Sequence, residues 1–274
     1  MGQVADIDLW QAVLLAIVQG LTEFLPISSS AHLVLPSEIL GWPDQGLAFD
    51  VAVHIGSLLA VVIYFRQDIR QLITGWFGSF VGQGVTAESK MAWAVIVATI
   101  PAGLVGLLFD SYIEANLRSV TVIATTTIGF GLLLGVADKK SFAKYEKVTM
   151  GVAVIIGFAQ AIALVPGTSR SGITMTAGLL LGLSRQLAAR FSFLLSIPLI
   201  AVAGGLKVWQ LIEMETTAPW GMIITAAGIS GITAYLCIHW FLKLLDKIGL
   251  MPFVIYRLLL GAVLIGLLAA GVTS

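Results

Sequence analysis

The feature that most constrains this chain is a series of long apolar stretches. Six of them are about as long as the roughly 20 residues that a helix needs to cross a bilayer. They cover about residues 48–65, 91–109, 119–137, 188–206, 219–242 and 252–272. Only 11% of the residues are charged, whereas soluble domains are about 25% charged. The sequence therefore predicts an all-α, polytopic integral membrane protein.

Charge and cysteine content narrow the class further. The formal net charge is zero, so no nucleic-acid partner is expected, and the expected surroundings are membrane lipids. Cys237 is the only cysteine, which rules out an internal disulfide and favours a small core residue. The first ten residues hold two aspartates and no basic residue, so we predict no cleaved signal peptide.

Two further apolar regions, 9–40 and 150–183, are each interrupted by a polar cluster that contains proline. The first cluster lies in the sequence TEFLPISSSAHLVLP, residues 22–36. Each half of these regions is too short to span a bilayer. Non-helical backbone at membrane depth is tolerated where protein or a water-filled cavity surrounds it. The sequence therefore predicts two re-entrant helical hairpins.

The two interrupted regions resemble each other and indicate a duplication. Each is followed by three predicted spans, which divides the chain into pseudo-repeats of about 1–138 and 139–274 within one membrane domain. Because three is odd, the second repeat must enter the membrane upside down, as in transporters with inverted-topology repeats. With Pro26 placed over Pro166, the aligned pairs are Ser28 and Thr168, Ser29 and Ser169, and Ser30 and Arg170.

The basic residues predict an orientation. Loop lysines and arginines fall mainly on one side, which the positive-inside rule makes cytoplasmic. These residues are Arg66, Arg70, Lys90, Lys139, Lys140, Lys144, Lys147, Arg185, Arg190, Lys243 and Lys247, against Arg118 and Lys207 on the other side. Hairpin 9–40 is then expected to open to the outside and hairpin 150–183 to the cytoplasm, with both termini outside.

Each polar cluster is followed by a predicted helix start. Serines 28–30 follow Pro26, and residues 167–169 (Gly-Thr-Ser) follow Pro166. A helix N-terminus offers free N–H groups and a partial positive charge, so it binds anions. Arg170 adds a guanidinium that suits phosphate oxygens. Two such ends that converge in the membrane predict a site for a phosphate-like anion.

The first hairpin also carries reactive groups. Ser29 and His32 are three residues apart, so they share a helical face, and a hydroxyl beside an imidazole can form an activated nucleophile. Glu23 could bind a divalent ion or handle a proton. Gln19 lies four residues earlier, on the same face as Glu23.

Other interpretations remain open at this stage. The serines could serve only as N-caps, and Glu23 with Arg170 could form a purely structural ion pair. Both charges are nevertheless costly in a bilayer and are functional candidates for that reason.

Several other polar residues lie in or beside the apolar stretches. His54 and His239 are expected to be packing residues. Asp50 is expected at the membrane interface, and Arg257 is expected either to pair with it or to reach the cytoplasmic interface.

The sequences QGLTEFLPISSSAH (19–32) and PGTSRSG (166–172) resemble the two signature motifs of the undecaprenyl-diphosphate phosphatase family, also called bacitracin-resistance proteins. The resemblance extends over essentially the whole chain. It implies hydrolysis of undecaprenyl diphosphate to undecaprenyl phosphate and inorganic phosphate, which recycles the lipid carrier for peptidoglycan and cell wall synthesis. It also implies a bacterial inner membrane location and a divalent cation, Mg²⁺ or Ca²⁺.

The same resemblance implies roles for individual residues. Glu23, Ser29, His32 and Arg170 match the family's catalytic motif positions, with Glu23 also a metal ligand and Ser29 or His32 the nucleophile. The residues expected to bind the diphosphate are Gln19, Ser28, Ser30, Thr168, Ser169 and Ser171. One departure matters, because the family's first motif often begins with Glu where this chain has Gln19, which cannot ionise.

Two rival functions come from other classes. Inverted repeats with broken helices are also typical of a transporter or lipid flippase. An acid-phosphatase-type enzyme would need a histidine paired with an aspartate after the Ser169-Arg170 motif, and the chain offers only His239 and the distant Asp246 there. The sequence leaves a homodimer open.

Overall fold

The computed structural model describes residues 7–82, 84–213 and 220–271, and the secondary structure of these residues is helical apart from one isolated β-bridge. Six helices in this part of the chain are long and apolar enough to cross a membrane, as expected of a multi-pass membrane protein. They are α3 (Gly46–Tyr64), α5 (Ala87–Asn116), α6 (Val120–Lys140), α9 (Arg185–Glu213), α10 (Trp220–Ile248) and α11 (Met251–Ala269).

The six predicted spans correspond to these helices, but several helices are longer than the apolar stretches. Helix α9 begins before and ends after the predicted span 188–206. Polar caps rather than the edge of the apolar stretch decide where some helices begin. Thr86 accepts a hydrogen bond from Ser89 N at the start of α5, and Ser119 accepts one from Val122 N at the start of α6. Predicted end points 219 and 272, and the terminal residues themselves, lie outside the described residues.

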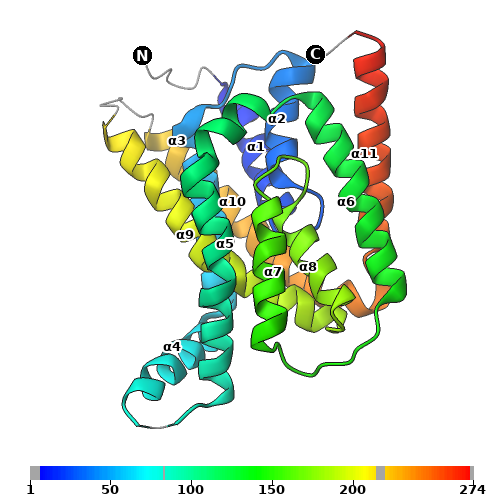
Figure 1. The fold of residues 1–274 in the computed structure, drawn as a ribbon. Helices are drawn as coiled ribbons and strands as arrows, with labels where there is room; N and C mark the ends of the chain where they lie inside the picture. Colours follow the sequence, from blue (N-terminus) through cyan, green and yellow to red (C-terminus); the bar gives the residue numbers. More distant parts are fainter. Residues whose placement is uncertain (1–6, 83, 214–219, 272–274) are drawn as a thin grey trace.

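Helix α4 (Arg66–Phe80) was not predicted from the apolar pattern. It has 15 residues, fewer than a membrane span needs, and it packs against α5. One contact is aromatic, because Trp76 lies edge-on to Trp93 of α5 with ring centroids 5.8 Å apart. Figure 1 shows α4 at one end of the helical bundle, opposite the end where α1 begins.

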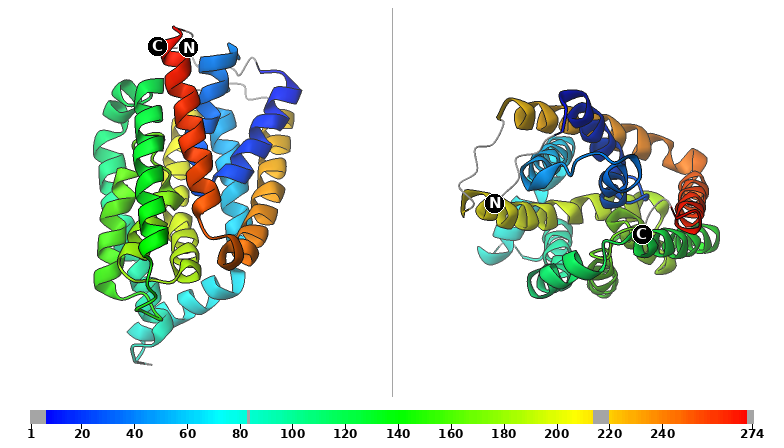
Figure 2. Two further views of the ribbon diagram at one scale, coloured as in Figure 1. Left: turned by 90° about the vertical axis from the view of Figure 1, so that its right-hand side faces the viewer. Right: turned by 90° about the horizontal axis from the view of Figure 1, so that it is seen from above.

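Two pairs of short helices enter the bundle and turn inside it. They are α1 (Leu9–Thr22) with α2 (Ser29–Leu40), and α7 (Met150–Ile162) with α8 (Arg170–Leu180). Figures 1 and 2 show that the first pair extends from the end opposite α4 and the second pair from the α4 end, with each pair turning inside the molecule. The turn of each pair coincides with a polar, proline-containing cluster of the sequence.

The helices around these turns pack closely through small residues. Helices α3 and α10 are in extensive contact, and Gly56 of α3 faces the backbone of Ala227 and Gly231 of α10. Ser57 and Ser230 hydrogen-bond to each other across the same contact at 3.1 Å. Small residues that allow such backbone approach, and polar links between helices, are how membrane helices associate.

A methyl group at Gly56 should therefore separate the two helices. Its carbon would lie 2.2 Å from Ala227 O, so we expect Gly56→Ala to destabilise the fold by about 1–3 kcal/mol through overpacking. The measurement is the midpoint of thermal unfolding in detergent. Gly103→Ala is the control, because a methyl group at Gly103 meets nothing within 4 Å. Equal midpoints for the two variants would contradict the close packing.

Candidate functional site

The two turns share an unusual backbone conformation. Ser28 has φ +72° and Ser169 has φ +71°, and they are the only described residues other than glycine with a positive φ. Each is the N-cap of the following helix, α2 or α8. A side chain in this region costs on the order of 1–3 kcal/mol, and such strain clusters at functional sites.

This shared conformation aligns the two turns one residue away from the register that the prolines predict. Ser28 corresponds to Ser169 rather than to Thr168, because both carry the positive φ directly before a helix. The hydroxyls repeat in the same register, since Ser28 and Ser30 lie 3.2 Å apart, as do Ser169 and Ser171. The feature that the two turns share is therefore the positive φ of the N-cap residue and not the position of the proline.

In this register Ser29 corresponds to Arg170, and Gln19 corresponds to Gln160. Both glutamines are fully buried, and neither Oε1 atom has a hydrogen-bond partner among the described residues. The reactive residues differ between the turns, so one turn contributes a hydroxyl where the other contributes a guanidinium.

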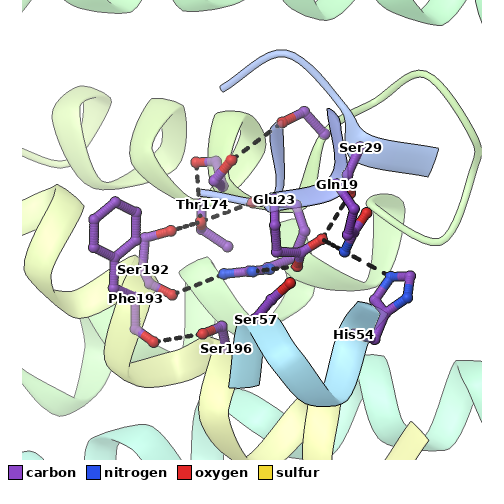
Figure 3. Close-up of polar contacts among 12 residues, drawn as sticks. Gln19, Glu23, Ser29, His54, Ser57, Thr174, Ser192, Phe193 and Ser196 are labelled. Atoms are coloured by element: carbon purple, nitrogen blue, oxygen red, sulfur yellow. Dashed lines mark hydrogen bonds and ion pairs between the residues drawn. The ribbon is translucent and has the colours of Figure 1, made fainter. Parts of the chain in front are cut away.

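Glu23 is the centre of the site (Figure 3). Its carboxylate is only 9% exposed and accepts hydrogen bonds on both oxygens. Oε1 accepts from Arg170 Nη2 at 2.8 Å, while Oε2 accepts from Ser29 Oγ at 2.7 Å and from Gln19 Nε2 at 3.0 Å. The structure thus brings four of the predicted site residues into direct contact across the two turns.

Arg170 is held in place from a third element. Its Nη1 donates to Ser192 O of α9 at 3.1 Å, and its guanidinium carbon lies 5.9 Å from the centre of the Phe24 ring. Thr174, one turn along α8, hydrogen-bonds to the Ser192 hydroxyl at 2.7 Å. The guanidinium is therefore fixed in orientation, which suits a group that must meet an anion.

Among the described residues His32 is not hydrogen-bonded to Ser29, although the sequence suggested that the two side chains could act together. Its Nδ1 lies 2.7 Å from Ser28 O, and its Nε2 lies 2.5 Å from the Tyr256 hydroxyl. A carbonyl oxygen only accepts, so Nδ1 donates, and a neutral imidazole then accepts from Tyr256 on Nε2. The described hydrogen-bond partner of Ser29 is Glu23, which makes the carboxylate the nearest base to that hydroxyl.

The other predicted binding residues lie on or near the same two turns. Ser171 donates to Leu25 O at 2.8 Å, which joins α8 to the first turn. Thr168 Oγ1 is buried and has no partner among the described residues. Ser30 is exposed at the start of α2.

Arg257 is the residue whose position the sequence analysis placed wrongly. It neither pairs with Asp50 nor reaches the interface. Asp50 instead accepts from Gln45 at 3.0 Å, while Arg257 is 0% exposed. Its guanidinium donates to five backbone carbonyls, two of them on α6 and the others in the two turns. These are the carbonyls of Thr126, Thr127, Pro26, Gly167 and Thr168.

Arg257 therefore joins three separate parts of the chain. The turn between α1 and α2, the turn between α7 and α8, and helix α6 all contact one guanidinium from α11. These carbonyls lie at the non-helical turns, where backbone groups inside a bilayer would otherwise lack partners. The sequence signal for a special role of Arg257 was its position in an apolar segment, because a charge inside a bilayer is costly unless it has a function.

His54 of α3 is a second residue that sequence reasoning missed. Its Nε2 lies 3.9 Å from Glu23 Oε2, so it borders the site rather than serving only as packing. His239, by contrast, lies edge-on to Tyr64 and Trp240, as a packing residue would.

The side chains around Glu23 could supply some of the ligands that a divalent cation needs, but not a complete coordination shell. No three His, Cys, Asp or Glu side chains come together among the described residues. Glu23 supplies the one carboxylate, and the buried, unpartnered Gln19 Oε1 is an adjacent neutral oxygen. Mg²⁺ is often bound by one or two carboxylates with substrate phosphates completing the shell. The residues fit a cation that an anionic ligand helps to hold.

Removing the Arg257 guanidinium should leave several buried carbonyls unpaired. Each buried polar group left without a partner costs about 1–3 kcal/mol, so we expect Arg257→Met to lose at least about 2 kcal/mol of stability. Thermal unfolding in detergent measures this. Arg66→Met is the matched control, because that exposed guanidinium donates to Ile63 O within its own turn. If Arg257→Met is as stable as Arg66→Met, the hydrogen bonds of Arg257 do not stabilise the two turns.

Comparisons with known proteins identify the family of the chain. Residues 12–263 match the family model described as bacitracin resistance protein BacA. A protein named undecaprenyl-diphosphatase from Hahella chejuensis is 63% identical, over 92% of this chain and 95% of its own length. Proteins of the same name from Teredinibacter turnerae and Saccharophagus degradans are each 58% identical, over 94% and 95% of this chain and 98% of their own lengths. The chain therefore belongs to the bacitracin resistance protein BacA family.

Proposed function

We propose that the chain hydrolyses undecaprenyl diphosphate to undecaprenyl phosphate and inorganic phosphate. The observation that carries this proposal is the 63% identity, over nearly the whole chain, to a protein named undecaprenyl-diphosphatase. The reaction recycles the lipid carrier that cell wall synthesis consumes. The chemistry at the two turns supports it, because a hydroxyl, a carboxylate and a guanidinium meet there between two helix N-termini.

The diphosphate is bound where α2 and α8 begin. The first N–H groups of a helix have no partner within the helix and attract anions. Arg170 lies at one of these starts, and the unpartnered Thr168 hydroxyl is available as a donor. The further hydroxyls near the anion are those of Ser28, Ser30, Ser169 and Ser171. The polyprenyl tail lies against the apolar helix surface among the membrane lipids.

In the first chemical step Ser29 is the nucleophile. Its Oγ forms a bond to the terminal phosphorus, and the bond from that phosphorus to the bridging oxygen breaks. The 2.7 Å hydrogen bond to Glu23 Oε2 orients Ser29 Oγ, and the Ser29 proton leaves on undecaprenyl phosphate. Undecaprenyl phosphate leaves with the electron pair of the broken bond, and Arg170 stabilises the charge on the phosphoryl oxygens.

The second step releases phosphate. Water attacks the phosphorus of the phosphoserine, the bond to Ser29 Oγ breaks, and Oγ takes one proton of the water. The other water proton leaves with the phosphate. Positioning and charge neutralisation provide most of the catalysis, as in other phosphoryl transfers.

His32 is the alternative nucleophile. Both of its ring nitrogens have hydrogen-bond partners, Ser28 O and the Tyr256 hydroxyl, so it would have to give up one of them before it could attack. Ser29 needs no such change, because it already donates to a carboxylate. This difference favours Ser29, and His32 then orients the N-cap of α2 through its bond to Ser28.

A divalent cation, Mg²⁺ or Ca²⁺, when bound, neutralises phosphate charge in such a site. Glu23 would hold it, with Gln19 Oε1 as a neutral ligand. Because Glu23 also accepts from Arg170 and Ser29, the carboxylate orients the guanidinium and the hydroxyl toward the same anion.

The arrangement in the membrane follows from the two hairpins. We propose that the pairs α1/α2 and α7/α8 are re-entrant and belong to inverted repeats of about 1–138 and 139–274. Their shared N-cap conformation and their approach from opposite ends of the bundle support this. The protein then lies in the bacterial inner membrane with α4 on the cytoplasmic side and both termini outside.

The nucleophile can be tested directly. Ser29→Ala is expected to lower the rate of phosphate release from a short polyprenyl diphosphate by at least about a thousandfold, since the attacking oxygen is lost. Acid quenching of the wild-type reaction with substrate labelled in its terminal phosphate should leave label on the protein. Ser37→Ala is the control, because that α2 hydroxyl only donates to Val34 O of its own helix.

Full activity of Ser29→Ala would remove the serine mechanism and favour His32. Phosphate release by purified protein in detergent, where no gradient exists, separates hydrolysis from transport. An absence of release from the wild-type protein would favour a lipid transporter instead.

The orientation can be tested with single cysteines in a Cys237→Ser background. Asp44→Cys is in the loop between α2 and α3, a segment at the end of the bundle where α1 begins (Figure 1), and Gln71→Cys is on α4. Both positions are exposed. In intact spheroplasts a membrane-impermeant thiol reagent should label residue 44 at once, and residue 71 only after permeabilisation. The reverse labelling pattern would overturn the orientation.

A further inference from the structure

His54 stands beside the Glu23 carboxylate with one ring nitrogen directed at it (Figure 3). Its Nδ1 lies 2.7 Å from Asp50 O. Because a carbonyl oxygen only accepts hydrogen bonds, Nδ1 must carry the hydrogen, and in the neutral ring Nε2 has a free lone pair. That lone pair belongs to the nitrogen that lies 3.9 Å from Glu23 Oε2.

The imidazoles of His32 and His54 therefore differ in their hydrogen bonding. His32 uses both ring nitrogens in hydrogen bonds. For His54 Nε2 no hydrogen bond is described within residues 7–82, 84–213 and 220–271, and its side chain is 34% exposed. A histidine whose Nδ1–H is fixed on a backbone carbonyl and whose Nε2 is free has the arrangement typical of metal-binding histidines.

A second unused donor lies at the same place. Gln19 is fully buried, and its Oε1 has no partner among the described residues although its Nε2 donates to Glu23. An unpaired buried oxygen is costly. The terminal amide can turn over, because its oxygen and nitrogen occupy nearly equivalent positions. Turning the amide would direct Oε1 toward Glu23 Oε2, where the N–H now points.

We propose that His54 Nε2 is a protein ligand of the divalent cation, together with Glu23 Oε2 and Gln19 Oε1. This proposal rests on the proposed cation requirement of the same site. Two ligands that are each about 2.1 Å from one cation can lie up to about 4.2 Å apart, so the distance of 3.9 Å between the His54 and Glu23 atoms can be bridged. Three protein donors would leave the remaining positions open for phosphate oxygens and water.

The nitrogen ligand has a consequence for metal preference. Imidazole favours transition-metal ions, whereas Ca²⁺ and Mg²⁺ prefer all-oxygen sites. The site has the neutral amide of Gln19 in place of a second carboxylate, and His54 adds a neutral nitrogen ligand. The site should therefore bind Mn²⁺ more tightly than Ca²⁺, and the difference should depend on His54.

Electron spin-echo spectroscopy of Mn²⁺ bound to the purified, full-length protein in detergent tests this ligand. We expect wild-type protein with one bound Mn²⁺ to show modulation from a directly bound nitrogen. Labelling of histidine alone with ¹⁵N should convert the signal to the ¹⁵N pattern, which assigns it to imidazole without any substitution. His54→Gln should abolish the modulation, and His32→Gln should retain it.

Binding constants give a second readout. His54→Gln should weaken Mn²⁺ binding about tenfold or more and change Ca²⁺ binding little, while thermal unfolding without metal stays close to that of the wild type. A bound Mn²⁺ without nitrogen modulation in the wild type would overturn the proposal, as would modulation that survives in His54→Gln.

The cation requirement itself is tested separately. Phosphate release that is unaffected by a chelator would contradict the cation in the proposed function. If release depends on a cation but Mn²⁺ is bound only through oxygen atoms, the role of His54 is contradicted and the proposed function is not.

Discussion

The site depends on a single buried guanidinium that binds the carbonyls of both turns. Non-helical backbone inside a membrane protein needs hydrogen-bond partners, since the bilayer supplies none. Arg257 provides them for Pro26 of the first turn and for Gly167 and Thr168 of the second. It also holds helix α6 against them. Two turns about 140 residues apart in the chain thus share hydrogen bonds to one guanidinium.

Positive charge exceeds negative charge around this guanidinium. Arg170 pairs with the Glu23 carboxylate, whereas no ion pair of Arg257 with a carboxylate is found among the described residues. The described acceptors of Arg257 are neutral carbonyls, so its charge is only partly offset. The helix N-termini of α2 and α8 add partial positive charge in the same place. A bound diphosphate would supply the missing negative charge. The affinity of the site for anions therefore follows from the charges and helix ends that form the two turns.

Much of this architecture could be predicted from the sequence, because long apolar stretches and broken apolar stretches have few solutions in a bilayer. The six spans and the polar turns were predictable for that reason. Helix α4 was not, since its pattern is amphipathic rather than apolar. The correct register of the turns depended on the backbone of Ser28 and Ser169, which proline positions do not reveal. The partners of Arg257 and His54 are tertiary contacts across distant helices, and no local pattern carries that information.

The position of Arg257 also bears on how the protein is made. It lies on α11, which follows the other described helices in the chain, whereas the turns that it binds lie earlier in the sequence. Domains generally begin to fold from the N-terminus during synthesis. Until α11 has been inserted, the carbonyls of both turns lack their common donor. The nascent chain therefore has no complete site before that point, and insertion of α11 is the step that completes the site.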